Sequence, residues 1–355
     1  MAIITKVDAN ELGALKAQAD ARMAQAKTDN NEGLILAEAL TYVESQLVKP
    51  LRPLFFARDL MSVDSSGSPW QDHFKYYELR GTHDDPKWVD SLGDGSIPSV
   101  NANLREVMGP VKGFALSATW TQDEINKIQA ANANRRAGEP AIGLEQELVE
   151  EVARGMADFE NNVLLYGDAA RGIKGFLNND SYAAAYPVPA NGGGNTSWDN
   201  KTPLEILEDL HEITWRQYIA TRQVEAPNKM VLSNTSLKLI STTPMSADNP
   251  RTILEQFLAT NRFINSQSQV MSIFNLERNE LATLPQVFQD GGLGFCYNDS
   301  SLVLKAKIPL QMQRVATFLP DQSNPFGFRA IWLERIGGVS VRRPQAILRF
   351  TGHEA

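Results

Sequence analysis

The sequence predicts an α+β protein with more than one structural lobe, and three observations support this. A half-buried strand at residues 113–120 runs directly into a capped helix, and a long amphipathic helix follows at about residues 142–165. Residues 306–355 are mostly strand-forming and are interrupted by prolines. Because the chain has 355 residues, more than most single hydrophobic cores hold, two or three lobes are expected.

The composition excludes several classes of protein. Hydrophobic residues make up 43% and charged residues 21%, and no run of about 20 apolar residues could cross a membrane. Residues 1–13 lack the basic and apolar regions of a secretory signal, so we expect folding in a cytoplasm and no membrane partner. A net charge of −8 argues against a dominant basic surface for nucleic acid, although local contact stays open.

Residues 1–61 predict an N-terminal arm with a leading helix. Residues 1–32 are polar and rich in alanine, so they bury too little to fold without a neighbour. Residues 33–49 form a stronger helical pattern, which Pro50 and Pro53 end.

Residues 62–119 predict a long excursion from the core. Turn-rich sequences at 62–70 and 91–110 flank an aromatic stretch at 73–89 that favours strand. Residues 113–120 then alternate in the manner of a half-buried strand. Its predicted inward side chains are Phe114, Leu116, Ala118 and Trp120.

The helix after this strand has a defined start. Thr121 is the predicted N-cap, Glu124 completes a capping box, and Trp120 packs on Ile125 as a hydrophobic staple.

The helix at about 142–165 carries one apolar stripe and one acidic face. It would be about 35 Å long at 1.5 Å per residue. The stripe consists of Leu144, Leu148, Val152, Met156, Phe159 and Val163, and the acidic face of Glu145, Glu147, Glu150, Glu151 and Glu160. Because no histidine lies at a helix position where it could join these carboxylates in a metal site, we interpret them as a solvated face with no catalytic or metal-binding role.

A glycine-rich stretch, "YGDAARGIKGFLNN", follows at residues 166–179. Such a stretch could cradle a phosphate, line an active site or turn the chain sharply. The Gly-Lys-Ser/Thr ending of a phosphate-binding loop is absent, so the sequence gives no support to a cofactor site there.

Residues 181–305 predict a compact α/β lobe. After a Gly/Asn/Pro-rich loop at 186–201, Thr202 begins a helix with Pro203 at its first position and Glu205 in a capping box. A strand at 228–233 and a short helix at 234–240 follow, and a second proline-led helix start is predicted at Asn249 and Pro250.

No catalytic, cofactor-binding or metal-binding residues are predicted. The four histidines, His73, His83, His211 and His353, are scattered, and a cation site at His83, Asp84 and Asp85 is less favoured than a surface turn. Cys296 is predicted to be a small buried hydrophobe. The doublets Arg135–Arg136 and Arg342–Arg343 could pair with phosphate, but salt bridges between subunits or solvation are favoured.

Taken in order, these segments resemble the major capsid proteins of tailed bacteriophages with the Hong Kong 97-type fold. The resemblance rests on "GFALSATWTQDEI", "LEQELVEEVARGMADFENNVLLYGD", "GIKGFLNN", "TPLEILEDLHEI", "APNKMVLSNTSLKLI" and "VRRPQAILRF", and covers about residues 60–350. It implies a structural shell protein of the virion, assembled in the bacterial cytoplasm, that encloses double-stranded DNA.

The resemblance also implies a division of the chain into named parts. These are an N-terminal arm and leading helix (1–61), an E-loop (62–119), a P-domain with the spine helix (120–180), an A-domain (181–305) and returning P-domain strands (306–355). In this scheme Gly167, Gly172 and Gly175 form a structural hinge toward the A-domain, and Asn178 and Asn179 tie it by side-chain hydrogen bonds.

The implied partners are copies of the chain itself, as pentamers and hexamers, and DNA held by non-specific contact. The short arm points to a separate scaffold protein, and a separate portal protein is also expected. Lys75, Lys87 and Lys112 match no crosslinking motif, so no covalent crosslink is predicted. Two alternatives stay open: an encapsulin-like compartment for protein cargo, and a soluble hydrolase that uses His83 or His211.

Overall fold

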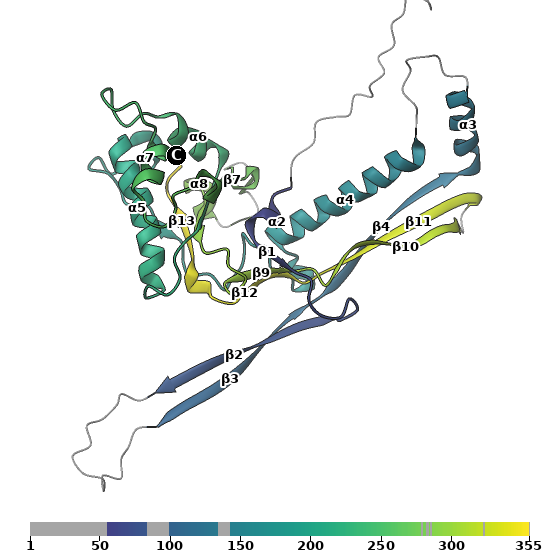
Figure 1. Ribbon diagram of the computed structural model, residues 1–355, viewed down its shortest axis with the longest axis horizontal. Coiled ribbons are helices and arrows are strands. Elements are labelled where there is room, and N and C mark those ends of the chain that lie inside the picture. Colours follow the sequence, from purple (N-terminus) through teal and green to yellow (C-terminus); the bar gives the residue numbers. More distant parts are fainter. Residues whose placement is uncertain are drawn as a thin grey trace, which may run out of the picture. The chain divides into compact units, whose positions relative to one another are not determined.

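A computed structural model describes residues 55–83, 99–133, 143–277, 280, 281, 284, 286–321 and 324–354 (Figure 1). The predicted helix at 33–49, Lys87, Asp84, Asp85 and the Arg135–Arg136 doublet lie outside these residues. The chain divides into two compact units, and within the smaller one the described part is essentially helix α3. The features below belong to the larger unit unless α3 is named.

Two strands that the sequence separates form a long antiparallel hairpin. Strand β2 (His73–His83) pairs with β3 (Val100–Pro110) over its whole length, from His73 opposite Pro110 to His83 opposite Val100. The prediction of strand for the first segment is confirmed, whereas the prediction of turn-rich sequence at 100–110 is wrong. Backbone pairing with β2 outweighs the low strand propensity of the asparagine-rich β3.

A three-stranded sheet in the order β10-β11-β4 packs against the long helix. It contains β4 (Lys112–Thr121), β10 (Leu310–Asp321) and β11 (Asn324–Ile336). Helix α4 (Leu144–Tyr166) lies along it, with the rings of Phe114 and Phe159 4.6 Å apart (Figure 1). The predicted strand and long helix are therefore confirmed. Helix α3 (Gln122–Ala133) begins directly after Thr121, as predicted.

One member of the predicted acidic face is not solvated. Glu160 is buried and bonded to Arg58, so its assignment to that face was wrong. The helix is covered near its C-terminal end by α2 (Ala57–Leu60), which supplies this arginine. Glu147, Glu150 and Glu151 are exposed, as predicted.

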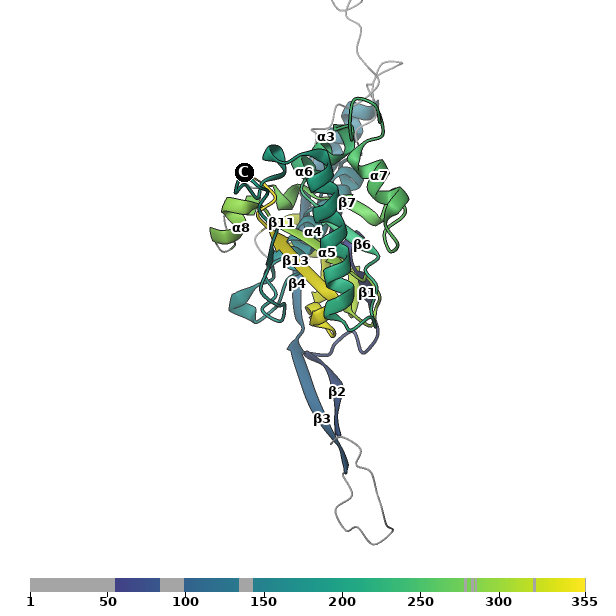
Figure 2. The ribbon, with the colours of Figure 1, turned by 90° about the vertical axis from the view of Figure 1, so that its left-hand side faces the viewer.

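The α/β part contains a five-stranded sheet in the order β5-β13-β8-β6-β7. Its strands are β5 (Tyr186–Pro187), β6 (Lys229–Leu232), β7 (Val270–Ser272), β8 (Gly294–Tyr297) and β13 (Ile347–Thr351). Its helices are α5 (Pro203–Ala220), α6 (Asn234–Thr242), α7 (Ile253–Thr260) and α8 (Gln286–Gly291) (Figure 2). The predicted strand at 228–233 and the helix after it are confirmed.

This sheet separates two hydrophobic clusters, because successive side chains of a strand point to opposite faces. Phe295 and Tyr297 join the cluster around the end of α4, while Cys296 joins the cluster under α5, α6 and α7. Cys296 is fully buried, which confirms its prediction as a core residue, and burial raises the pKa of its thiol.

Capping chemistry fixes the helix starts of this part. Thr202 and Glu205 form the predicted capping box of α5. The predicted start at Asn249 and Pro250 is wrong, since α7 begins at Ile253 with Thr252 and Glu255 as its capping box. Asn249 instead belongs to a turn, closed by backbone hydrogen bonds with Ser246.

The remaining strands form a small sheet in the order β1-β9-β12. They are β1 (Ser62–Asp64), β9 (Leu304–Lys307) and β12 (Gly338–Val341). Short 3-10 turns, among them Ala169–Arg171, Trp198–Asn200, Gln267–Gln269, Phe274–Leu276 and Pro344–Ala346, connect the elements. In the part of the chain that the structure describes, no helix is long and apolar enough to cross a membrane.

Candidate functional site

The glycine-rich turn after α4 is closed by two glycines that approach each other. Gly167 has a φ of +71°, and a Cβ atom there would lie 2.5 Å from the carbonyl oxygen of Ile173. A Cβ atom on Gly175 would lie 2.4 Å from the amide nitrogen of Gly167. Both distances are too short for any side chain, so the backbone can turn in this way only with glycine at both positions. Gly172, also at positive φ, ends the 3-10 turn between them.

Polar side chains hold this turn in place. The Asp168 carboxylate accepts a hydrogen bond from the amide of Arg171 at 3.2 Å and pairs with its guanidinium. The Asn178 side-chain amide donates to the carbonyl of Tyr166, and the buried Asn179 accepts from the amide of Ser181 at 3.0 Å. The turn therefore contains local hydrogen bonds of the predicted kind, while its role as a hinge stays a prediction.

Four backbone amides of the turn are not free to bind a phosphate. The amides of Gly167, Asp168, Gly172 and Ile173 all donate to carbonyl oxygens of the chain, at 2.8–3.2 Å. A phosphate cradle needs several such groups free and pointing at the ligand. Phe176 and Leu177, directly after the turn, are fully buried and fix it to the core.

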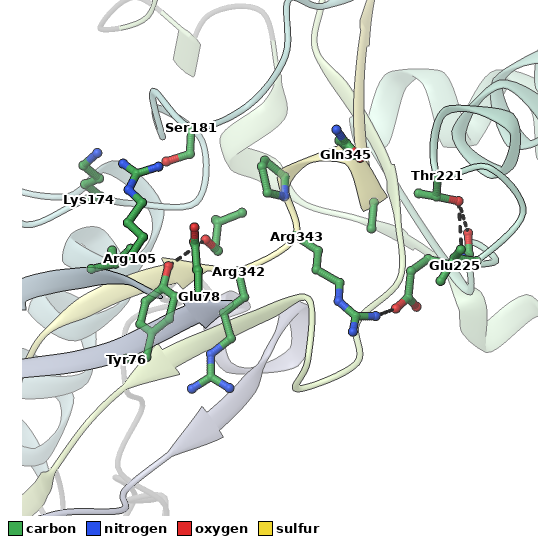
Figure 3. Close-up of a pocket in the computed structure, with 15 residues that line it drawn as sticks. Tyr76, Glu78, Arg105, Lys174, Ser181, Thr221, Glu225, Arg342, Arg343 and Gln345 are labelled. Atoms are coloured by element: carbon green, nitrogen blue, oxygen red, sulfur yellow. Dashed lines mark hydrogen bonds and ion pairs between the residues drawn. The ribbon is translucent and has the colours of Figure 1, made fainter. Parts of the chain in front are cut away.

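A cavity of about 690 Å³ brings this turn together with the predicted basic doublet (Figure 3). It lies between the base of the β2–β3 hairpin, the turn, the residues after α5 and the segment between β12 and β13. The labelled residues of its lining are Tyr76, Glu78, Arg105, Lys174, Ser181, Thr221, Glu225, Arg342, Arg343 and Gln345.

Most of the charged side chains that line the cavity already contact other residues of the chain. Arg343 forms an ion pair with Glu225, and Lys174 forms one with Asp180. Arg342 lies over the ring of Tyr76 at 5.3 Å, and the Tyr76 hydroxyl donates to the carbonyl of Val341 at 3.3 Å. Burial, and next the carboxylate of Glu78, raise the pKa of Tyr76. These contacts attach the inner face of the hairpin to the core.

The outer face of the hairpin is unlike its inner face. Because residues directly opposite in an antiparallel pair share a face, Leu79 and Leu104 lie side by side, flanked by Tyr77 and Met108. These four side chains, which we call the apolar stripe, are 61–70% exposed. The excursion predicted from the sequence thus exposes an apolar surface of its own.

The histidine side chains that the structure describes, those of His73, His211 and His353, do not assemble a metal site. Among the described residues no three His, Cys, Asp or Glu side chains are placed to hold a metal ion. His211, predicted on the surface of a helix, is half-buried within hydrogen-bond distance of Thr260 (3.0 Å), and burial lowers its pKa. His353 is fully buried between the rings of Trp198 and Phe350, and no sequence signal indicated this.

Comparison with known proteins decides the family. The profile of a family described as major capsid protein matches residues 84–352, more than half of the chain. The chain belongs to the major capsid protein family. This family is structural, which confirms the prediction of a capsid protein and not an enzyme, and removes the hydrolase alternative.

Solved structures show the same fold. The capsid of Myoviridae phage XM1 is 13% identical with a TM-score of 0.67, covering 89% of this chain and 98% of its own. The capsid of an empty GTA particle, computed with C5 symmetry, is 14% identical with a TM-score of 0.56, covering 89% and 95%. A Microbacterium phage Oxtober96 structure is 11% identical with a TM-score of 0.55, covering 90% and 97%.

These likenesses establish a mixed α+β fold of the Hong Kong 97 type, as the sequence predicted. No curated protein sequence matches the chain. The major capsid protein is a component of a capsid, and capsids are built from many copies of such a subunit.

Proposed function

We propose that copies of this major capsid protein assemble, as pentamers and hexamers, into an icosahedral shell that encloses double-stranded phage DNA. The observation that carries the proposal is the apolar stripe on the hairpin of a chain that belongs to a capsid family. Large apolar side chains that a single chain leaves exposed in a row are typical of surfaces that a partner covers. In a shell the natural partner is the next copy of the chain.

The proposal assigns the predicted parts of the chain to roles in assembly. Residues 62–119 act as an E-loop that lies across a neighbouring P-domain. Residues 120–180 and the strands of 306–355 form the P-domain, and residues 181–305 form an A-domain that meets its copies at the symmetry axes. The backbone pairing of β13 with β8 and β5 supports one refinement, in which residues 347–351 complete the A-domain sheet.

We further propose that the turn at Gly167, Gly172, Gly175, Asn178 and Asn179 is a structural hinge between the spine helix and the A-domain. Its support is the close backbone approach at Gly167 and Gly175 described above. The hinge sets the path of the chain and binds no ligand.

The other proposed partners follow from charge and from the resemblance. A chain with a net charge of −8 needs local basic or neutral patches where it faces DNA, because a uniformly acidic wall would repel it. Separate scaffold and portal proteins complete the assembly. No covalent crosslink between subunits is included.

Electron microscopy with light scattering tests the proposal, on the chain expressed alone and together with neighbouring phage genes. Closed shells that contain DNA are expected in at least the second case. A persistent 39.3 kDa monomer under both conditions would contradict shell assembly. Shells filled with protein cargo would instead support the encapsulin-like alternative.

Two single substitutions test the role of the stripe. Leu104→Asp places a charge in the apolar stripe, and Asn103→Asp places the same charge one residue away on the opposite face of β3. We expect Leu104→Asp to abolish shells and Asn103→Asp to retain them, because only the first puts a charge into an apolar contact. Equal assembly of both variants would show that the stripe is not an interface.

A further inference from the structure

Two buried acidic side chains and one half-exposed arginine, from distant segments of the chain, meet beside α4. The guanidinium of Arg58, from α2, donates two hydrogen bonds to the carboxylate of Glu160, from α4, at 2.7 and 2.6 Å. Glu334, from β11, brings a second carboxyl to within 3.9 Å of the same guanidinium. The side chains of Glu160 and Glu334 are 6% and 1% exposed. Two buried acids therefore share one arginine.

The next residue of α4 holds the start of α2. The side-chain oxygen of Asn161 accepts hydrogen bonds from the amides of Phe56 and Ala57, both at 3.1 Å. Two consecutive residues of α4 thus hold α2. Glu160 binds the Arg58 side chain, and Asn161 binds the backbone at the start of the helix. Strand β1 follows α2 directly and pairs with β9, so this attachment also positions the chain where the hairpin segment begins.

The charges at this site do not balance if both acids are ionised. Among the described residues, the charged groups that face Glu334 are Glu160 and Arg58. The two neighbouring strands bring no further charge to Glu334. Strand β4 places Phe114 opposite it, and the part of β10 beside it, residues 310–313, contains no charged residue. The Oε1 atom of Glu334 has no hydrogen-bond partner. If both acids were ionised, the half-exposed Arg58 would balance only one of two buried carboxylates, and an unbalanced buried charge is unfavourable.

A bound proton removes this imbalance. Burial, followed by the charge of Glu160 and contact with its carboxyl, raises the pKa of Glu334 to about 8, while Arg58 acts in the opposite direction. Near neutral pH Glu334 is then mostly protonated, and the guanidinium of Arg58 remains with Glu160 alone. Buried pairs of acids that share a proton behave in this way.

We propose that Glu160 and Glu334 form a proton-binding site that latches α2 onto α4. With the proton bound, Arg58 stays on Glu160 and the backbone of α2 stays on Asn161. When the proton is released to solvent, two carboxylates compete for Arg58 and the latch weakens. This inference concerns the folded subunit and does not depend on shell assembly.

The sign of the pH effect follows from linkage. A folded-state pKa of about 8 lies above the usual value of 4.5 for a glutamate, so the folded chain holds a proton that the unfolded chain lacks. Its stabilising contribution is complete below about pH 4.5 and is lost as the pH rises through about 8. One such proton changes the folding equilibrium constant by up to about tenfold per pH unit.

The test compares Glu334→Gln with the full-length wild-type chain and with Asp158→Asn. Glutamine keeps the shape of the protonated acid but cannot titrate, and Asp158→Asn removes one exposed carboxylate from α4, the helix that carries Glu160. The readouts, from pH 5 to 9, are the urea unfolding midpoint and the hydrogen exchange of the Phe56 and Ala57 amides, corrected for intrinsic exchange rates. Between pH 5 and pH 9 we expect the protection factors of these amides to fall at least tenfold in the wild type and in Asp158→Asn. We expect no such fall in Glu334→Gln.

A third variant separates a proton-binding role from a structural one. Glu160→Gln removes the negative neighbour of Glu334. In this variant the Phe56 and Ala57 amides should therefore lose protection at a lower pH than in the wild type. Titration of the Glu334 carboxyl by NMR in the wild-type chain provides the second measurement and needs no variant to fold. A Glu334 carboxyl that titrates near pH 4.5, or a Glu334→Gln chain whose exchange depends on pH as in the wild type, would overturn the proposal.

Discussion

The β2–β3 hairpin and the five-stranded sheet are both built from paired strands, yet they differ in what covers them. In β8 of the sheet, Phe295, Cys296 and Tyr297 are fully buried, because hydrophobic clusters lie on both faces. In the hairpin, Leu79 and Leu104 are 69% and 70% exposed. The sheet obtains its burial from its own chain, whereas the described residues of the chain leave the outer face of the hairpin uncovered.

Truncation of one large side chain in each region gives the largest expected contrast. Phe295→Ala should lower the free energy of unfolding by about 3–5 kcal/mol, because it leaves a cavity beside Phe176 and Tyr297. Leu104→Ala should change it by less than about 0.5 kcal/mol, because the side chain is already in solvent. Urea unfolding of subunits kept unassembled measures both, and a large loss for Leu104→Ala would contradict the comparison.

Ion pairs sharpen the same contrast. In the α/β part, Lys201 is buried, 2.5 Å from the carboxylate of Asp209, which also accepts from the indole of Trp198 at 3.0 Å. Lys201→Met should cost about 3–5 kcal/mol of unfolding free energy, because it leaves Asp209 buried without its cation. The hairpin pair of Lys75 and Glu106 is 57% and 45% exposed, so Lys75→Met should cost no more than about 1 kcal/mol. Equal losses in urea unfolding would contradict this prediction.

A buried histidine makes the α/β part sensitive to acid. Burial lowers the pKa of His353 from 6.5 to about 3, so between these values the unfolded chain binds a proton that the folded chain cannot. Stability should therefore fall as the pH drops from about 6.5 toward 3, by at most about 1.4 kcal/mol per pH unit. His353→Phe should reduce this slope in urea unfolding, and an unchanged slope would contradict the prediction.

The smallest effect concerns a helix cap. Thr202→Ala removes the hydroxyl that accepts from the amide of Glu205 at 3.4 Å, and should lower the free energy of unfolding by about 1 kcal/mol. Thr202→Ser keeps the hydroxyl and is the control. Thermal unfolding measures both, and an unchanged midpoint for Thr202→Ala would show that the long bond contributes little.

Local signals in the sequence predicted many elements correctly. The strand at 113–120, the long helix α4 and the capping box at Thr202 were each predicted from residues a few positions apart, and all three are confirmed. Two predicted inward side chains, Leu116 and Phe159, are nevertheless 40% and 44% exposed. No single motif indicated the family; the order of these elements along the chain did. The start of α7 was misplaced since Asn249–Pro250 and Thr252–Glu255 are two start signals only three residues apart.

Features that depend on distant residues could not be predicted in this way. Strand β3 exists because β2 pairs with it, and Glu160 is buried because Arg58 and Glu334 reach it from about 100 and 170 positions away. The same holds for the cavity, where Lys174 and Arg342 meet only through the fold. The glycine content of residues 166–179 suggested a sharp turn, but it could not show which backbone atoms Gly167 and Gly175 approach.

The position of β13 has a consequence for how the protein is made. Residues 347–351 form an inner strand between β5 and β8, whose residues leave the ribosome much earlier. Until these late residues emerge, β8 lacks a neighbour on one side and the cluster that contains Phe350 is incomplete. A nascent chain therefore cannot finish this sheet before translation has passed residue 351, and a subunit with a complete sheet cannot appear earlier.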